Sequence, residues 1–333
     1  MVTISNNDCV SCVTETTYLR PFRIDRHNSS GYSAAITQTP ACGKICSYDW
    51  DYRDNGTLWP LFYKAVNCQN TLYRMAHSPY PVVRPPPRRP PANLVNDYTV
   101  NGQCPVIYRY FDHSSSEKKK TPIHFTAKAF RALLAQERVG NINRYRDKNV
   151  LKPVLRTHVH VIEGMHVAVI GTQIPWAEAM LLNLGARHVT TVEYTELHID
   201  DDRVTNVTPY ELANRFLSGQ ADPFDTVFSY SSLEHSGLGR YGDPLSPFGD
   251  LEASAQVWCM VKSGGHFILA VPVHKNRKRC SVAWNAHRRY GIVRLQHLTA
   301  NWRVLNFYDA RDDGRHGVYI LEKVSFNSTG KTE

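Results

Sequence analysis

The fold is decided by the stretch His166–Gly171, which reads HVAVIG. A short apolar run followed by glycine is typical of a strand that is buried on both faces and ends in a tight turn. The run from Pro175 to Leu184 predicts a helix, because proline suits a first helical turn and Gly185 closes the segment. Strand, turn and helix in this order are the opening unit of a doubly wound α/β domain.

The same alternation continues toward the C-terminus. We predict further strands at 188–193, 203–207, 224–229 and 266–272. Helices are predicted between them at 209–217 and 251–261. Two last apolar runs, 303–308 and 317–322, lie close enough to pair as an antiparallel hairpin. Strands that alternate with helices imply a parallel sheet covered on both faces, so we predict a Rossmann-like, doubly wound sheet of seven mostly parallel strands.

Composition narrows the classes of protein that need to be considered. Of the 333 residues, 42% are hydrophobic and 21% are charged, which indicates a globular chain. Neither a signal peptide nor a stretch of about 20 apolar residues is visible, which makes a cytoplasmic protein without a membrane span the default expectation. The net charge of +9 favours anionic partners, but without a recognisable aromatic-basic module we predict no nucleic-acid role.

Composition also suggests how the chain is divided. We predict a Cys-containing region at 1–78, a Pro/Arg-rich and polar linker at 79–121, the α/β domain at 122–325 and a tail at 326–333. Within the linker, Arg84–Pro91 reads RPPPRRPP, which predicts an extended polyproline-II segment. We interpret it as a stiff spacer, although it could also dock in the groove of a partner domain.

The cysteines leave several possibilities open. Six precede the α/β region and two, Cys259 and Cys280, lie inside it. The spacing of Cys9, Cys12, Cys42 and Cys46 could hold zinc, and an even set could form disulfides in an oxidising compartment. We expect free structural thiols and no metal site.

Candidate cofactor-binding residues follow from one rule: in an open α/β sheet, ligands bind beyond the carboxyl ends of the strands. Gly171 and Pro175 form the turn before the first helix, where backbone N–H groups and the positive helix end point at an anionic group. Glu193 ends the second strand and can accept hydrogen bonds from ribose hydroxyls. Ser231 follows the fourth strand at the same edge. With a single glycine in the turn, we predict an adenosine-containing cofactor other than NAD.

The same edge supplies candidates for catalysis and substrate binding. His235 and His287 follow neighbouring strands, and either could act as a general base near neutral pH. A long glycine-rich loop spans residues 237–250, after the fourth strand. The candidate substrate-binding residues lie in this loop or after the fifth strand, and they are Arg240, Asp243, Asn285 and Arg288. We predict that the loop is a lid or binding loop.

Four segments carry a resemblance to a known family, and they are Val169–Trp176, Thr190–Tyr194, Ser231–Pro244 and Asn285–Gly291. Together they resemble the domain of unknown function 268, over about residues 141–324. That family is more distantly similar to class I methyltransferases, as are Phe224–Val227, Leu233–His235 and Val261–Gly265 here. The resemblance implies a class I methyltransferase-type sheet and S-adenosylmethionine as cofactor.

The sequence leaves two functions open for the α/β domain, and a third possibility is an interaction protein that works through the Pro/Arg-rich segment. The first is S-adenosylmethionine-dependent methyl transfer to an oxygen or nitrogen acceptor, carried by a small molecule or a glycan. The second is a catalytically inactive, methyltransferase-like module that binds a sugar, a nucleotide or a protein partner. The fold alone does not choose between them, because one fold hosts many functions.

Overall fold

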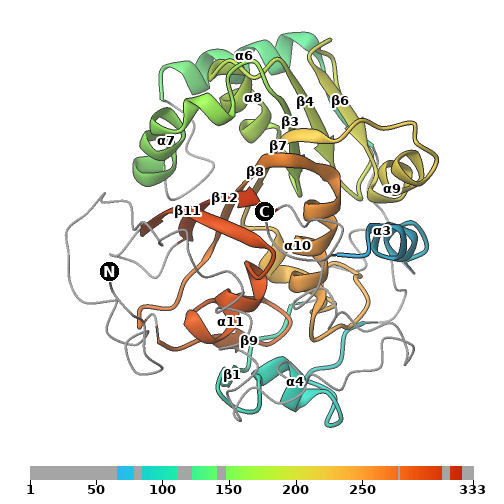
Figure 1. Ribbon diagram of the computed structural model, residues 1–333, viewed down its shortest axis with the longest axis vertical. Helices are drawn as coiled ribbons and strands as arrows, with labels where there is room; N and C mark the ends of the chain where they lie inside the picture. Colours follow the sequence, from blue (N-terminus) through green and yellow to red (C-terminus); the bar gives the residue numbers. More distant parts are fainter. Residues whose placement is uncertain are drawn as a thin grey trace.

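A seven-stranded sheet forms the centre of the computed structural model, which describes residues 66–78, 85–111, 122–140, 148–276, 278–309 and 316–324. The strand order is β11-β12-β8-β7-β3-β4-β6 (Figure 1). The bounds are β3 His166–Ile170, β4 His188–Val192, β6 Val204–Val207, β7 Phe224–Tyr230, β8 Val261–Pro272, β11 Trp302–Asp309 and β12 His316–Lys323. The predicted count of seven strands is confirmed.

Strand directions place a ligand-binding edge in the middle of this sheet. Strands β6, β4, β3, β7 and β8 pair in parallel, whereas β12 runs antiparallel to both β8 and β11. The sheet is therefore mixed, and the predicted C-terminal hairpin is confirmed. From β3 the chain builds outward through β4, then crosses to β7 on the other side of β3. The order of strands thus switches between β3 and β7, where the carboxyl ends of the strands leave room for a ligand.

Helices cover both faces of the sheet, as Figure 1 shows. One layer holds α6 (Ala127–Arg138), α7 (Lys148–Thr157) and α8 (Trp176–Asn183), and the other holds α3 (Cys68–Ala76), α9 (Pro209–Leu217) and α10 (Gly249–Met260). Strand β8 shows why both layers are needed. Ile268 and Ala270 pack into the first layer, whereas Phe267, Leu269 and Val271 pack into the second. Alternate residues of a strand point to opposite faces, so a strand that is apolar throughout requires cover on each.

Smaller elements surround this core. Strand β1 (Val106–Ile107) pairs in parallel with β9 (Ser281–Ala283), which pairs with β10 (His287–Arg289), and β2 (Ile123–Phe125) pairs with β5 (Leu197–Ile199). The other helices of the described residues are α4 (Val95–Thr99), α11 (Ile292–Leu298) and the single 3-10 turns η3 (Val159–Val161) and η4 (Leu233–His235). Thr126 caps α6, because its hydroxyl accepts the Ala129 N–H at 3.3 Å. Within the described residues no helix is both long and apolar enough to cross a bilayer.

The segment before the α/β domain is joined to it, which corrects two predictions. Disulfides link Cys68 to Cys259 and Cys104 to Cys280, so these four cysteines are not free thiols. Pro86 is buried, and the Pro87 carbonyl accepts a 2.8 Å hydrogen bond from the indole of Trp284. Residues 85–91 therefore pack against the domain and are not a free spacer. The prediction failed because the partners lie nearly 200 residues away in sequence. The candidate zinc ligands, Arg84 and the tail lie outside the described residues.

Candidate functional site

Gly171 forms the turn after β3 at the switch in strand order. Its φ of +75° lies in the left-handed region, and its N–H donates to the Val192 carbonyl at 3.1 Å. A Cβ on residue 171 would lie 2.1 Å from the Ser232 Oγ. Contact with the end of β7 therefore requires glycine here, independently of any ligand.

The three residues after Gly171 present open hydrogen-bond donors. Among the described residues, no acceptor receives the backbone N–H groups of Thr172, Gln173 or Ile174. The Thr172 hydroxyl donates to the Ile174 carbonyl at 2.7 Å, which stabilises the turn. Helix α8 begins two residues later, with Pro175 at its N-cap and no side-chain cap. Open amides beside a helix N-terminus form a site suited to an anionic group.

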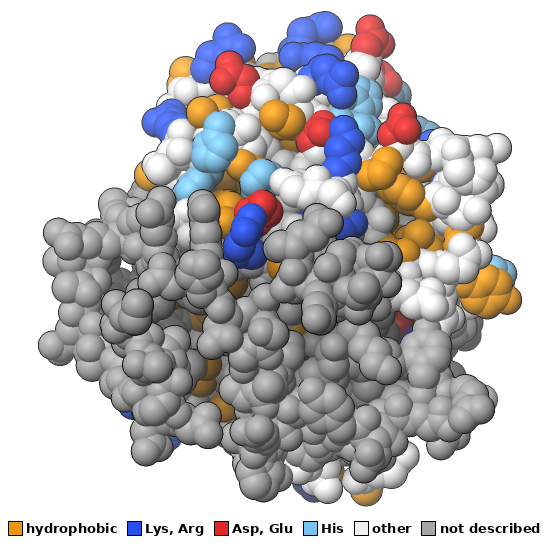
Figure 2. Space-filling model, in the orientation of Figure 1, with side chains coloured by type: hydrophobic (Ala, Val, Ile, Leu, Met, Phe, Trp, Pro, Cys, Tyr) orange, Lys and Arg blue, Asp and Glu red, His pale blue; other side chains and the backbone are white. Residues whose placement is uncertain are grey.

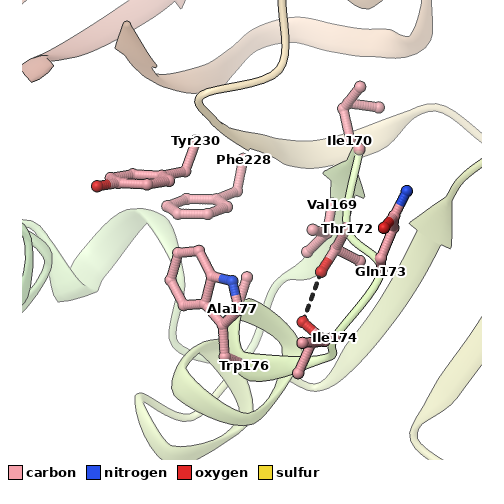
Figure 3. A pocket seen from close by; sticks show the side chains of 10 residues that line it. Val169, Ile170, Thr172, Gln173, Ile174, Trp176, Ala177, Phe228 and Tyr230 are labelled. Carbon is pink, nitrogen blue, oxygen red and sulfur yellow. Dashed lines mark hydrogen bonds between the residues drawn. The ribbon is translucent and has the colours of Figure 1, made fainter. Parts of the chain in front are cut away.

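A cavity of about 220 Å³ lies against this turn. The turn forms one of its walls, and aromatic rings form another (Figure 3). The ring of Trp176 meets that of Tyr230 edge to face, with centroids 5.3 Å apart, and Phe228 lies beside them. Backbone donors facing an aromatic wall can bind a ligand that has both an anionic and an apolar part.

Glu193 follows β4 next to the same turn, since the residue before it accepts the Gly171 N–H. Its side chain is half-buried, and one carboxylate oxygen accepts the Thr195 N–H at 3.2 Å. Below it, Glu178 of α8 is fully buried. The Thr191 hydroxyl donates to one oxygen of Glu178 at 2.8 Å, and the other has no hydrogen-bond partner among the described residues. Burial raises the pKa of Glu178 to about 7.

A buried carboxylate organises the histidines at the ends of β7 and β12. Ser231, with φ +52°, donates its hydroxyl to the Glu234 Oε1 at 2.5 Å. The Nε2 atoms of His235 and His316 lie 3.6 and 3.8 Å from that same oxygen. Burial alone would raise the pKa of Glu234, but these two histidines hold it below its ordinary value. Glu234 is therefore an anion placed between two imidazoles.

The two predicted catalytic histidines lie close together. Their ring centroids are 6.3 Å apart and nearly perpendicular. His235 Nδ1 lies 2.5 Å from the Ala286 carbonyl oxygen, which can only accept, so Nδ1 carries the proton. Burial lowers the pKa of His287 to about 4, helped by the nearby His235, so His287 is neutral at pH 7.

Three of the four candidate substrate-binding residues hold the surrounding chain in place. Asp243 accepts the N–H groups of Gly239 and Tyr241 within its own loop, at 3.0 and 3.3 Å. Asn285 is buried and accepts the Phe111 N–H at 2.5 Å. The buried guanidinium of Arg288 donates to backbone carbonyls, which include that of Ser236 at 2.6 Å.

Arg240 differs from these three. Its guanidinium is half-buried and lies 4.6 Å from the centre of the Phe111 ring and 5.0 Å from that of Tyr241. The charge of Arg240 therefore lies over two aromatic rings.

A buried ionic network of Asp250, Arg288 and Arg294 packs against the loop of residues 237–250. Asp250, at the start of α10, accepts from the Arg294 Nη2 at 2.6 Å and from the Tyr290 hydroxyl at 2.8 Å, while the Arg288 Nε lies 3.5 Å away. Burial opposes ionisation, but the two arginines hold the pKa of Asp250 below its usual range. The two ends of this loop meet where the Ser246 N–H donates to the Gly237 carbonyl at 3.0 Å. Only glycine fits at residue 237, because a Cβ there would lie 2.1 Å from the Ser246 carbonyl oxygen.

Sequence reasoning missed four residues of this region. Tyr230 directly precedes Ser231, so its place at the predicted strand end was a usable signal. Glu178 is the one charged residue in the apolar run 176–184, which was a second signal. For Trp176 and His316 we find no such signal, because their positions depend on how α8 and β12 pack.

Solved structures that match this chain at low identity include methyltransferases and putative hemolysins. One match is the 1,6-didemethyltoxoflavin-N1-methyltransferase of Burkholderia thailandensis, crystallised with S-adenosylhomocysteine, at 15% identity and a TM-score of 0.37, covering 62% of this chain and 93% of that one. Another is an S-adenosylmethionine-dependent methyltransferase of Mesorhizobium loti, at 12% identity and a TM-score of 0.35, covering 51% and 96%. A third is the N-methyltransferase NodS of Bradyrhizobium japonicum, at 11% identity and 0.35, covering 52% and 96%. No curated protein matches the sequence significantly.

The family comparison agrees with the resemblance found in the sequence. Residues 164–329 match the family described as Caenorhabditis protein of unknown function, DUF268. The match begins just before β3 and extends past β12, so it contains the whole seven-stranded sheet. Residues 164–329 of this chain, which hold its whole seven-stranded sheet, therefore match the DUF268 family model.

Proposed function

We propose that the α/β domain binds S-adenosylmethionine and transfers its methyl group to an oxygen or nitrogen nucleophile. The observation that carries the proposal is the set of open amides at Thr172–Ile174, which face a cavity at the switch in strand order. An amino-acid carboxylate is the anion that these donors would accept. Glu193, at the end of the next strand, suits the hydroxyls of a ribose.

The size of the cavity limits which part of the cofactor it would take. Its volume of about 220 Å³ is below the roughly 300–1,000 Å³ of most ligand sites. A bound cofactor would therefore extend out of it along the carboxyl edge toward Glu193. Because Ser232 fills the space beside Gly171, the amides after that glycine would make the closest backbone contacts.

The histidine cluster supports a role in handling the acceptor. S-adenosylmethionine, when bound, supplies a methyl group on a good leaving group, so alignment would account for most of the rate. With its proton on Nδ1, His235 has Nε2 left to take a proton from the acceptor. Glu234, 3.6 Å from that atom, would stabilise the imidazolium that forms. Arg240 would bind a negative group on the acceptor.

Isothermal titration calorimetry with S-adenosylmethionine and S-adenosylhomocysteine, with NAD as a control ligand, tests this function. We expect binding by the intact protein and a loss of at least about tenfold in Glu193→Ala, because the ribose partner is removed. Glu196→Ala is the matched control, since Glu196 is exposed three residues later. A folded protein that binds neither ligand, or equal affinity in Glu193→Ala, would contradict the assignment.

A further inference from the structure

Arginine side chains stack on aromatic rings at the surface of the small sheet β1-β9-β10. Each pair joins residues from separate parts of the chain, and the pairs are Arg88 over Tyr110 at 4.7 Å, Arg89 over Tyr108 at 5.5 Å and Arg240 over Phe111 at 4.6 Å. We call this set the arginine–aromatic surface. Arg88 and Arg89 are exposed, and Tyr108 is 62% exposed, which is unusual for so large a ring. Their planar groups are therefore available to a partner.

Among the described residues, the two segments joined by the Cys104–Cys280 disulfide carry little negative charge. Residues 273–291 contain no Asp or Glu, and residues 85–111 contain only Asp97. Exposed cations in these two segments include Arg109, Lys275, Lys278 and Arg279. Such a surface attracts a polyanion and repels cationic partners.

The arginine–aromatic surface is held in place by the fold. The disulfide Cys104–Cys280 and the pairing of β1 with β9 fix the segment that carries Tyr108, Tyr110 and Phe111. The Tyr110 hydroxyl donates to the Pro86 carbonyl at 2.9 Å, two residues before Arg88 in the sequence. Because these backbone positions are already fixed, less conformational entropy is lost when a partner binds.

The surface borders the candidate site. Phe111 donates its N–H to Asn285, two residues before His287, and its ring contacts Arg240. A chain bound along Arg89, Arg88 and Arg240 would thus reach the histidines.

We propose that the arginine–aromatic surface binds an acidic polysaccharide. Guanidinium groups pair with carboxylate and sulfate groups through two parallel hydrogen bonds, and exposed tyrosine rings pack on the apolar faces of sugars. Two disulfides favour an oxidising compartment, where acidic glycans rather than nucleic acids are the abundant polyanions. This binding does not depend on methyl transfer.

The test uses the full chain with its disulfides intact and a fluorophore-labelled heparin oligosaccharide, followed by fluorescence anisotropy at fixed ionic strength. Arg88→Glu/Arg89→Glu should weaken binding by about tenfold or more, because attraction becomes repulsion. The matched control is Arg131→Glu/Arg138→Glu on α6, which makes the same change in net charge at exposed positions. Figure 2 shows side chains of both signs interspersed over that part of the molecule, so the control should bind normally.

Further arms separate the alternatives. Arg88→Lys/Arg89→Lys keeps the charge but removes the planar groups, and should give an intermediate loss. Equal losses in the two Glu variants, tighter binding of single-stranded DNA through the same arginines, or no heparin binding by the folded protein would each overturn the proposal. S-adenosylmethionine titration of Arg88→Glu/Arg89→Glu should be unchanged, and Glu193→Ala should still bind heparin, so failures of the two proposals are distinguishable.

Discussion

The Thr191 hydroxyl on β4 donates a 2.8 Å hydrogen bond to the buried carboxyl group of Glu178 on α8. It links the second strand to the helix that begins at the proposed cofactor turn. Because the other Glu178 oxygen has no hydrogen-bond partner among the described residues, ionising this group inside the protein is costly.

This pair predicts a pH dependence of stability. Burial raises the pKa of Glu178 from 4.5 to about 7, so the folded state holds a proton that the unfolded state releases. The stabilising contribution is complete below pH 4.5 and is lost as the pH rises toward 7. Relative to wild type, Glu178→Gln should gain on the order of 3 kcal/mol over that range. Urea unfolding at pH 5 and pH 8 measures the difference. Glu196→Gln should show no such gain, and a parallel pH profile for wild type and Glu178→Gln would refute the burial argument.

Removing the charge of Asp250 should destabilise the domain strongly. Asp250→Asn leaves the buried guanidinium groups of Arg288 and Arg294 without a counter-ion, which costs about 3–5 kcal/mol. Asp222→Asn at an exposed position is the control, with an expected change within about 0.5 kcal/mol. Chemical denaturation at neutral pH compares them, and similar midpoints in the two variants would show that the network carries little stability.

The contact between Gly171 and Ser232 predicts a coupled pair. Gly171→Ala introduces a Cβ at 2.1 Å from the Ser232 Oγ and at a positive φ, for a cost of about 3 kcal/mol. Ser232→Gly removes the obstructing atoms, so the double variant should regain roughly half of that loss. Thermal unfolding of the four proteins of the cycle measures the coupling. Strictly additive losses would mean that the turn relaxes away from Ser232.

Disulfide mapping gives a direct chemical check. Proteolysis without reductant, followed by mass spectrometry, should yield peptides that join Cys68 to Cys259 and Cys104 to Cys280. Cys104→Ala/Cys280→Ala should lose about 2–5 kcal/mol of stability, because that bridge closes a long loop of the unfolded chain. Alkylation of all four thiols in the native protein is the result that this pairing does not allow.

The sequence was informative where structure is local. The apolar runs at 166–170 and 266–271 lie in central strands, and residues such as Thr126 mark helix ends. The carboxyl edge could also be predicted, because parallel strands bring their ends together, and Glu193, Ser231 and His235 all lie there. What the pattern misses is pairing over long distances. Neither β1 with β9 nor Cys68 with Cys259 leaves a periodic signal, and both depend on the assembled fold.

The same distinction between local patterns and long-range packing applies to the site residues. The pattern placed His235 and His287 on neighbouring segments, and they lie together. The sequence pattern could not show that Arg288 donates its hydrogen bonds to backbone carbonyls. In a sequence, an arginine that stabilises a loop looks the same as one that binds a ligand. The aromatic wall at Trp176 and Tyr230 depends on the angle at which α8 crosses the sheet, which side-chain packing sets.

The parallel pairing of β1 with β9 affects how the chain can be made. Cys104 is synthesised 176 residues before Cys280, a delay on the order of ten seconds at typical elongation rates. During that time the early segment lacks both its strand partner and its thiol partner, while another early cysteine, Cys68, waits for Cys259. The growing chain therefore carries Cys68 and Cys104 without their native partners until Cys259 and Cys280 have been added, which leaves time for these thiols to pair wrongly.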